Sequence, residues 1–445
     1  MQISLTRTEN PSLSYAWYVV VILMLANISS FIDRQILALL VVPIKRDLHL
    51  TDTRMSLLMG LSFAIFYTLF GIVISRLADR TNRRNVIVAG IAIWSLLTSL
   101  CAGVKNYSQF FLARMGVGVG EASLSPSAYS LISDYFPKRK LGLALSIFSM
   151  GIFLGSGLAL AIGAGLVANL PKEGTVEVPI LGSIFHWQIL FLLIGLPGLL
   201  ISLLLFTIKE PPRKDALQEN AMQKKLSLKD ALKIVFRHPK TYLCVSLGTA
   251  FTAFASYGFT AWIPTYFYRT FGWPVPKAGL YFGLVLLTGS MAGVTWGGSY
   301  ADYLKTKNIH HGRIKVGIIA ATGIGLSSFI PLIPNPNIVL PLLFLPAFFI
   351  ASPIGACATA VQELMPNRTR ALAGAIFLFI INIIGLAFGP LTVAFFTDSI
   401  FKDESAIRFS LVALLVIAGI LSFIFYIIGI RGYKKIHPTL ILHNG

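Results

Sequence analysis

Long apolar segments recur along almost the whole chain, and they limit the folds that this sequence can adopt. About 20 apolar residues are needed for a helix to span a bilayer, whereas a membrane barrel would show short segments of alternating hydrophobicity, which this sequence lacks. Only 12% of the residues are charged, against roughly 25% in soluble domains. We therefore expect an all-α membrane protein with twelve transmembrane helices. Their expected centres are Met24, Phe66, Ser95, Glu121, Gly155, Leu196, Phe254, Leu287, Gly323, Ile350, Ile383 and Ala418.

The basic residues are distributed unevenly among the connecting segments. The net charge is +19, and most of the 37 Lys and Arg residues share one side of the membrane if both termini are cytoplasmic. Because cytoplasmic loops are enriched in Lys and Arg, we expect both termini in the cytoplasm, and the cell (inner) membrane as the location if the source is bacterial. The charge then does not indicate nucleic acid, although it will attract anionic membrane lipid. The basic clusters are residues 76–84, 138–140, 209–240, 305–315 and 431–435.

Four charged residues lie deep within two of the apolar segments. Asp33 and Arg34 interrupt the first segment, and Arg114 and Glu121 interrupt the fourth. The last two are seven positions apart, so they lie on one face of a helix, two turns from each other. A charge at mid-bilayer is costly and normally faces a bundle interior or water, where it serves a function. These four residues are therefore candidates for a functional site.

A short turn after the second apolar segment carries one acid among four bases. Its sequence, Ser75-Arg-Leu-Ala-Asp-Arg-Thr-Asn-Arg-Arg84, resembles the G-x-L-A-D-R-x-G-R-R motif of the major facilitator superfamily, with Ser75 and Asn82 in place of the two glycines. The resemblance implies that the acid pairs with bases and with a helix start in the opposite half, closing the cytoplasmic side; an anion near a helix N-terminus is favourable. The residues assigned to this cytoplasmic gate are Asp79, Arg80, Arg83, Arg84, Asp134, Arg139, Asp302, Glu363 and Arg368.

An internal repeat supports the same fold. The segment around Pro137 and Arg139 aligns with the segment around Pro366 and Arg368, which indicates two homologous halves of six helices each. We therefore expect two pseudo-symmetric six-helix bundles, the major facilitator fold. The first bundle is placed at residues 1–208, a cytoplasmic linker at 209–240 and the second bundle at 241–445. The linker is expected to be solvated and to hold a short amphipathic helix near residues 226–236.

A narrower resemblance rests on Gly118-Val-Gly-Glu-Ala-Ser123, together with Phe31-Ile-Asp-Arg34 and Gly155-Ser-Gly157. This combination resembles the Spinster branch of the superfamily, in a bacterial-type form. Spinster proteins are implicated in proton-linked movement of lysophospholipids and sphingolipid phosphates. The resemblance therefore implies an amphiphilic lysolipid- or sphingolipid-like substrate, alternating access and protons as the coupling ion. We expect the protein to act as a monomer.

The resemblance implies that the first and fourth helices line a central cavity, so Asp33, Arg34, Arg114 and Glu121 are expected to converge. Two acids and two bases can be buried only as pairs, because an unpaired charge in a low dielectric is costly. If a substrate headgroup draws an arginine away, the carboxylate left behind would take a proton. We assign the protonation switch to Glu121, a second proton site to Asp33, and exchange between carboxylate and substrate to the two arginines. A static tetrad that only locks the two helices is the structural alternative.

The second half offers aromatic and neutral polar residues instead of buried charges. This asymmetry would suit an amphiphile, with its headgroup near Arg34 and its tail against aromatic rings. Each Tyr or Trp alone is also explained by ordinary packing or by anchoring at the membrane interface. The second-half candidates for substrate binding are Tyr257, Trp262, Tyr266, Thr359 and Asn382.

Other functional classes fit the sequence less well. It contains no HExxH, no nucleophile elbow and no P-loop, so we expect neither an enzyme nor an ATP-driven pump, and no cofactor. The three cysteines have no CxxC spacing and predict neither a disulfide nor a metal site. A channel is the alternative from another class, and a small organic anion, such as an aromatic or sugar acid, is the alternative cargo. Symport or antiport, the proton stoichiometry and the role of the loop at 169–186 stay open.

Overall fold

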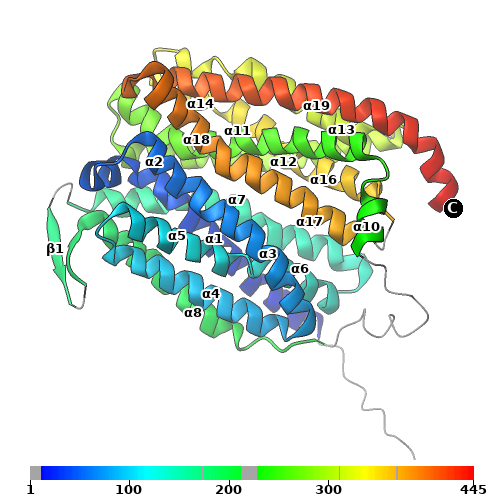
Figure 1. Ribbon diagram of the computed structural model, residues 1–445, viewed down its shortest axis with the longest axis horizontal. Coiled ribbons are helices and arrows are strands. Elements are labelled where there is room, and N and C mark those ends of the chain that lie inside the picture. Colours follow the sequence, from blue (N-terminus) through cyan, green and yellow to red (C-terminus); the bar gives the residue numbers. More distant parts are fainter. Residues whose placement is uncertain are drawn as a thin grey trace, which may run out of the picture.

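The structure, a computed structural model, describes residues 12–171, 174–179, 181–211, 228–309, 311–366 and 369–444. Figure 1 shows two groups of long helices packed against each other, coloured blue to green in the first half of the chain and green to red in the second. Within the described ranges, eleven helical segments are long and apolar enough to cross a membrane. The chain is therefore a multi-pass, all-α membrane protein, as the apolar segments predict.

The first half ends with α8, and a single two-stranded hairpin lies within its described residues. It comprises α1 (Leu13–Leu48), α2 (Asp52–Ser56), η1 (Leu57–Leu61), α3 (Ser62–Arg80), α4 (Arg83–Leu100), η2 (Cys101–Gly103), α5 (Tyr107–Glu121), α6 (Leu124–Tyr135), α7 (Lys138–Ala168), β1 (Thr175–Val178), β2 (Gly182–Phe185), η3 (His186–Gln188) and α8 (Ile189–Leu205). The strands β1 and β2 pair antiparallel, with Thr175 opposite Phe185. They occupy the loop for which the sequence suggested no role.

The second half follows a short linker helix, α10 (Leu228–Val235), which lies where the amphipathic helix was expected. It comprises α11 (Pro239–Phe271), α12 (Val275–Thr306), α13 (Gly312–Ser327), η4 (Ile330–Leu332), α14 (Pro336–Leu342), α15 (Phe344–Ala351), α16 (Pro353–Glu363), α17 (Arg370–Ile381), η6 (Asn382–Ala387), α18 (Phe388–Phe395), η7 (Phe396–Phe401), η8 (Glu404–Ala406) and α19 (Ile407–Asn444). The π-helical segments η6 and η7 continue the axis begun by α17, so these elements form one long apolar segment.

The fourth predicted span is divided into α5 and α6 by a turn at Ala122 and Ser123. Pro126 explains the interruption, because proline cannot donate the backbone bond to the carbonyl four residues earlier and its ring clashes with that carbonyl. The hydroxyl of Ser123 instead donates to the carbonyl of Gly120 at 2.9 Å. Neither helix alone is long enough to be counted among the eleven spanning segments.

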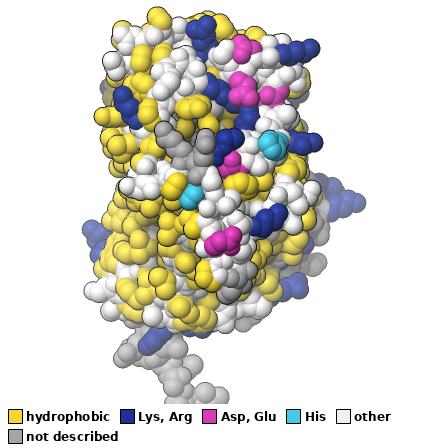
Figure 2. Space-filling view, turned by 90° about the vertical axis from the view of Figure 1, so that its left-hand side faces the viewer, with side chains coloured by type: hydrophobic (Ala, Val, Ile, Leu, Met, Phe, Trp, Pro, Cys, Tyr) yellow, Lys and Arg dark blue, Asp and Glu magenta, His cyan; other side chains and the backbone are white. Residues whose placement is uncertain are grey.

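The molecule has two ends that differ in composition. The hairpin β1–β2 lies at one end, which we call the hairpin end (Figure 1). The linker helix α10 and the C-terminus lie at the opposite end, the linker end. The start of α1 is also at the linker end, since Tyr15 donates to the carbonyl of Thr207, just after α8. Figure 2 looks onto the hairpin end and shows acidic and basic side chains gathered among apolar ones.

Glycines allow the two halves to approach closely. A Cβ on Gly283 of α12 would lie 3.0 Å from the carbonyl oxygen of Gly157 of α7. A Cβ on Gly60 of η1 would clash with the carbonyl oxygen of Leu386 of η6. The backbones of the two halves therefore touch along two seams, α7 with α12 and η1 with η6, where side chains larger than hydrogen would hold them apart.

Candidate functional site

Four charged side chains meet inside the first half. Helix α1 supplies Asp33 and Arg34, and α5 supplies Arg114 and Glu121. Arg34 Nε donates to Glu121 Oε2 at 2.7 Å, and Nη1 of Arg114 donates to Asp33 Oδ1 at 3.1 Å. Asp33, Arg114 and Glu121 are each no more than 3% exposed. The predicted convergence of the two helices through paired charges is therefore present in the structure.

Hydroxyl groups complete the two ion pairs. Ser30 donates to the same oxygen of Glu121 that accepts from Arg34, at 2.5 Å. Thr98 of α4 donates to the second carboxylate oxygen of Asp33. Ser30 lies three residues before Asp33, on the same face of α1, a spacing that could have identified it from the sequence. Thr98 comes from a third helix and has no local sequence signal.

Aromatic rings surround the guanidinium of Arg34. Its central carbon lies 4.9 Å from the ring centre of Phe31, 4.4 Å from that of Phe63 and 4.7 Å from that of Tyr67. Tyr257 of α11, in the second half, is close enough to interact with the same guanidinium. Each such ring contact stabilises a cation by about 0.5–2 kcal/mol, more when water is excluded. Arg34 is therefore held at the boundary between the two halves.

Two polar atoms in the cluster have no hydrogen-bond partner among the described residues. They are Oε1 of Glu121 and Nε of Arg114, both buried. Buried polar atoms without partners are uncommon in folded proteins and call for an explanation. Ser30 and Arg34 both donate to Oε2 of Glu121. The other carboxylate oxygen, Oε1, can therefore take a proton or accept a further hydrogen bond.

Small residues on α5 position the cluster. A Cβ on Gly118 would lie 2.7 Å from the carbonyl oxygen of Phe63 on α3, and a Cβ on Gly120 would lie 2.8 Å from the backbone nitrogen of Trp94 on α4. Glycine at these positions thus lets α5 lie directly against α3 and α4. This contact brings Arg114 and Glu121 within reach of α1 while keeping water out.

The five second-half candidates do not gather at one place. Tyr257 reaches the Arg34 guanidinium. Trp262 and Tyr266 are completely buried, and they donate to the carbonyls of Pro390 and Pro331, each at 3.0 Å. Those bonds give the two rings a packing role within the second half in this conformation. Thr359 donates to the carbonyl of Gly355 in its own helix at 2.9 Å, and Asn382 begins η6.

At the linker end, one of the predicted gate residues, Arg83, has two acidic partners. Its side chain is buried and binds Asp134 at 2.5 Å and Glu210 at 2.7 Å. Arg84 donates to the carbonyl of Ile208 at 3.0 Å. These contacts tie α4 to α6 and to the segment after α8, all within the first half. Glu210 was not predicted, because an acid in a charged linker is indistinguishable from a solvated one.

Another predicted gate residue, Glu363, has its partner in the second half. Glu363 pairs with Arg313, which the sequence did not single out, at 3.0 Å within the second half. Arg80, Arg139 and Asp302 are exposed. The side chain of Asp79 and the whole of Arg368 lie outside the part of the chain that the structure describes. The cytoplasmic gate therefore stays a prediction.

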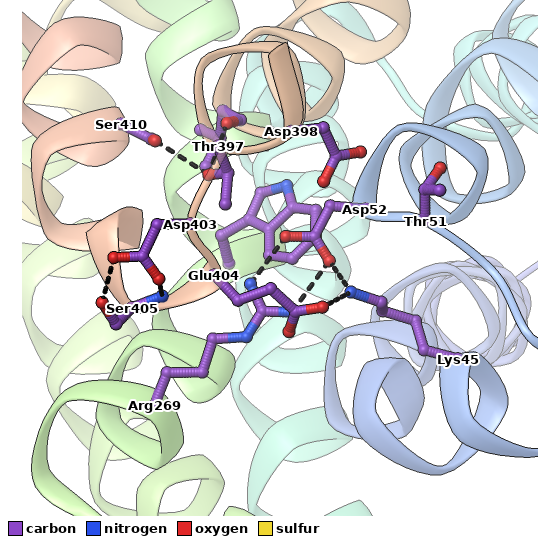
Figure 3. A network of polar contacts seen from close by, with 12 residues as sticks. Lys45, Thr51, Asp52, Arg269, Thr397, Asp398, Asp403, Glu404, Ser405 and Ser410 are labelled. Carbon is purple, nitrogen blue, oxygen red and sulfur yellow. Dashed lines mark hydrogen bonds and ion pairs between the residues drawn. The ribbon is translucent and has the colours of Figure 1, made fainter. Parts of the chain in front are cut away.

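A second ionic network joins the two halves at the hairpin end. Figure 3 shows the carboxylates of Asp52 and Glu404 between the ammonium of Lys45 and the guanidinium of Arg269. Lys45 pairs with Asp52 and, at 2.8 Å, with Glu404. Arg269 binds Asp52 through two bonds of 2.6 and 2.8 Å and Glu404 at 2.6 Å. Lys45 and Asp52 belong to the first half, and Arg269 and Glu404 belong to the second.

A further contact at the hairpin end crosses between the halves. Asp398 of η7 accepts from the backbone nitrogen and from the hydroxyl of Thr53, each at 2.7 Å. Thr53 is in the first turn of α2, where an acidic group is favourable. The hairpin end is therefore closed by charge pairs between the halves, and sequence reasoning did not find this network.

Comparison with known proteins identifies the class. The family model of the Major Facilitator Superfamily matches residues 23–390, so the chain belongs to this superfamily of membrane transporters, not to a family of enzymes. Within the superfamily the chain is Spinster-like. The crystal structure of a bacterial homologue of the human lysosomal transporter Spinster, in an inward-facing and occupied conformation, superposes with a TM-score of 0.80 at 26% identity, covering 95% of this chain and 98% of that one.

Two curated relatives extend the comparison. An MFS-type efflux pump of Mycolicibacterium smegmatis is 27% identical over 411 residues, which cover 91% of this chain and 90% of the pump. A sphingosine-1-phosphate transporter of Danio rerio is 29% identical over 255 residues, which cover 56% of this chain and 47% of that transporter. The resemblance to the Spinster branch that the sequence motifs suggested is thus confirmed.

Proposed function

We propose that this protein is a proton-coupled secondary transporter that moves an amphiphile with an anionic headgroup by alternating access. The observation that carries the proposal is the Arg34–Glu121 pair, in which an arginine surrounded by aromatic rings holds a carboxylate with one unpartnered buried oxygen. A similar relative transports sphingosine-1-phosphate, which combines an anionic headgroup with an apolar tail. Such a ligand would place its headgroup at Arg34 and extend its tail toward the second half, past Tyr257.

The proposed cycle follows from competition for one arginine. When a headgroup anion binds Arg34, the bond from Arg34 Nε to Glu121 is lost, and the buried carboxylate is left without a counter-charge. A charge isolated in this way is costly, so Glu121 takes up a proton. The reverse exchange releases the proton on the side of the membrane where the substrate leaves. Asp33, held by Arg114 and Thr98, is proposed as a second proton site.

Conformation and orientation enter the proposal as well. We assign the hairpin end to the outside and the linker end, with both chain termini, to the cytoplasm, which places most basic clusters inside. Ionic pairs between the halves at the hairpin end then correspond to a state closed toward the outside. We further propose that the protein acts as a monomer in the cell membrane, with protons as the coupling ion and no cofactor.

The proposal is tested by flux measurements in liposomes. A labelled lysophospholipid is supplied with and without an imposed pH gradient to wild type, to Glu121→Gln and to Glu177→Gln, which removes an exposed acid of the hairpin. We expect flux that depends on the gradient in wild type and in Glu177→Gln, and no gradient dependence in Glu121→Gln. If a sugar acid, and not the lysolipid, showed gradient-dependent flux, the substrate would be a small organic anion and the same coupling mechanism would apply to it. Flux that Glu121→Gln retains in full would remove this residue from coupling.

A further inference from the structure

A cavity of about 630 Å³ lies between the two halves at the hairpin end, away from the buried charge cluster. Helices α1 and α7 form one wall, and the end of α11 and the start of α12 form the other. Most of its lining is apolar, and the volume falls within the roughly 300–1,000 Å³ of typical ligand pockets. The apolar lining includes Leu39, Val42, Val167, Leu170, Tyr268 and Val275.

Basic groups line the same cavity. Among the described lining residues, Arg46 and Lys277 provide two cations, one from each half, and Asp47 provides one carboxylate. That carboxylate is already engaged, because it accepts from Arg46 Nε at 2.7 Å and from Trp187 Nε1 at 3.0 Å. The ammonium of Lys277 lies 4.1 Å from the ring centre of Trp273, and its N–H groups that do not face the ring can donate to an acceptor. The described residues of the lining therefore carry more positive than negative charge.

A ring nitrogen beside the cavity has no hydrogen-bond partner among the described residues. Nδ1 of His186, beside the cavity, is buried and makes no hydrogen bond among the described residues. Imidazole nitrogens in the interior are normally paired, so this nitrogen is a candidate partner for a ligand in the cavity. Apolar walls with cations and an unpaired ring nitrogen match a molecule that has an acyl chain and a phosphate. Basic pockets between transmembrane helices recognise anionic lipid headgroups in this way.

We propose that this cavity binds an anionic phospholipid of the surrounding bilayer, with an acyl chain along the apolar walls and the phosphate at Arg46, Lys277 and His186. The site differs from the cargo site at Arg34 and does not depend on what the protein transports. Because both halves form the walls, the cavity exists in this form only while the hairpin end is closed. A bound lipid therefore stabilises the closed conformation relative to the open one.

The test compares lipids that differ in the headgroup alone. Purified full-length protein is titrated with phosphatidylglycerol or with phosphatidylcholine of the same acyl chains, and bound lipid is counted by native mass spectrometry. We expect wild type to prefer phosphatidylglycerol and the double variant Arg46→Gln/Lys277→Gln to bind it at least tenfold more weakly, at about 1 kcal/mol for each basic residue lost. Binding of phosphatidylcholine should change little in the same variant.

Two further variants separate charge from folding. Arg46→Lys/Lys277→Arg keeps both cations and should keep the preference. Arg54→Gln/Lys402→Gln removes two exposed cations near the same end that do not line the cavity, and it should behave as wild type. Equal binding of the two phospholipids by wild type, or an unchanged preference in Arg46→Gln/Lys277→Gln, would overturn the proposal. Lysophosphatidylglycerol that displaces phosphatidylglycerol through the same two cations would instead make the cavity a cargo site and would also contradict it.

Discussion

The ionic network at the hairpin end allows a quantitative prediction about conformation. Asp52 is fully buried and the side chain of Arg269 is 8% exposed, whereas that of Glu404 is 62% exposed. Removing one partner of a buried pair costs about 3–5 kcal/mol. In Arg269→Gln the cost is nearer the lower figure, because Lys45 still neutralises Asp52.

The substitution destabilises only the conformation that is closed at the hairpin end, because water solvates the same charged groups once the halves separate. A loss of about 3 kcal/mol corresponds to a shift of roughly 100-fold in the equilibrium toward opening at the hairpin end. Glu404→Gln removes a mostly exposed partner, which is worth at most about 1 kcal/mol and therefore about fivefold. The two variants should differ clearly although both remove contacts of one network.

Distances between spin labels measure the opening. Labels at Ser108 of the first half and Lys402 of the second, both exposed near the hairpin end, are read by double electron–electron resonance after the three native cysteines have been replaced. We expect a longer distance to dominate in Arg269→Gln and the shorter one to persist in Glu404→Gln. The reasoning would be refuted if Arg269→Gln kept the distances of wild type, or if Glu404→Gln opened the protein equally.

Three more predictions follow from contacts in the first half. Arg34→Lys keeps the charge but loses the planar group that lies over three rings, so the substrate Kd should rise roughly tenfold in a binding assay while the protein stays folded. Gly120→Ala forces α5 away from α4 and should lower the free energy of unfolding by about 1–3 kcal/mol, whereas Gly142→Ala, whose Cβ would meet nothing within 4 Å, should not lower it. Arg83→Gln removes the guanidinium that binds Asp134 and Glu210 and should cost about 3 kcal/mol of stability in denaturant titrations; an unchanged midpoint would show that these ion pairs are dispensable.

The buried cluster could be predicted from the sequence because a charge in an apolar segment has few places to lie. Asp33, Arg34, Arg114 and Glu121 stood out for that reason. Which acid pairs with which base depends on the rotation of two helices about their axes, which the sequence does not specify. The hydroxyl of Thr98 was not predicted, because Ser and Thr in membrane helices commonly bond to their own backbone.

The network at the hairpin end was missed for a different physical reason. Lys45, Asp52, Arg269 and Glu404 all lie at the ends of apolar segments, where charged residues are ordinary and usually solvated. These four residues form a network only where the two halves meet. How the halves meet depends on contacts between residues that are far apart in the sequence. Trp262 and Tyr266 were predicted to bind substrate, but in this structure they pack within the second half. The sequence could not distinguish the two roles, because an aromatic residue that packs and one that binds a ligand occur in the same sequence pattern.

The central claim is that the substrate headgroup and Glu121 compete for Arg34, so that substrate binding causes Glu121 to take up a proton. Its most direct test is to add a soluble, short-chain lysophospholipid to purified protein in a weakly buffered solution and to follow the pH. The account predicts that binding draws Arg34 from Glu121 and causes proton uptake by wild type, and that Glu121→Gln binds the lipid without taking up that proton. Binding by wild type without proton uptake, or equal uptake by Glu121→Gln, would contradict the account.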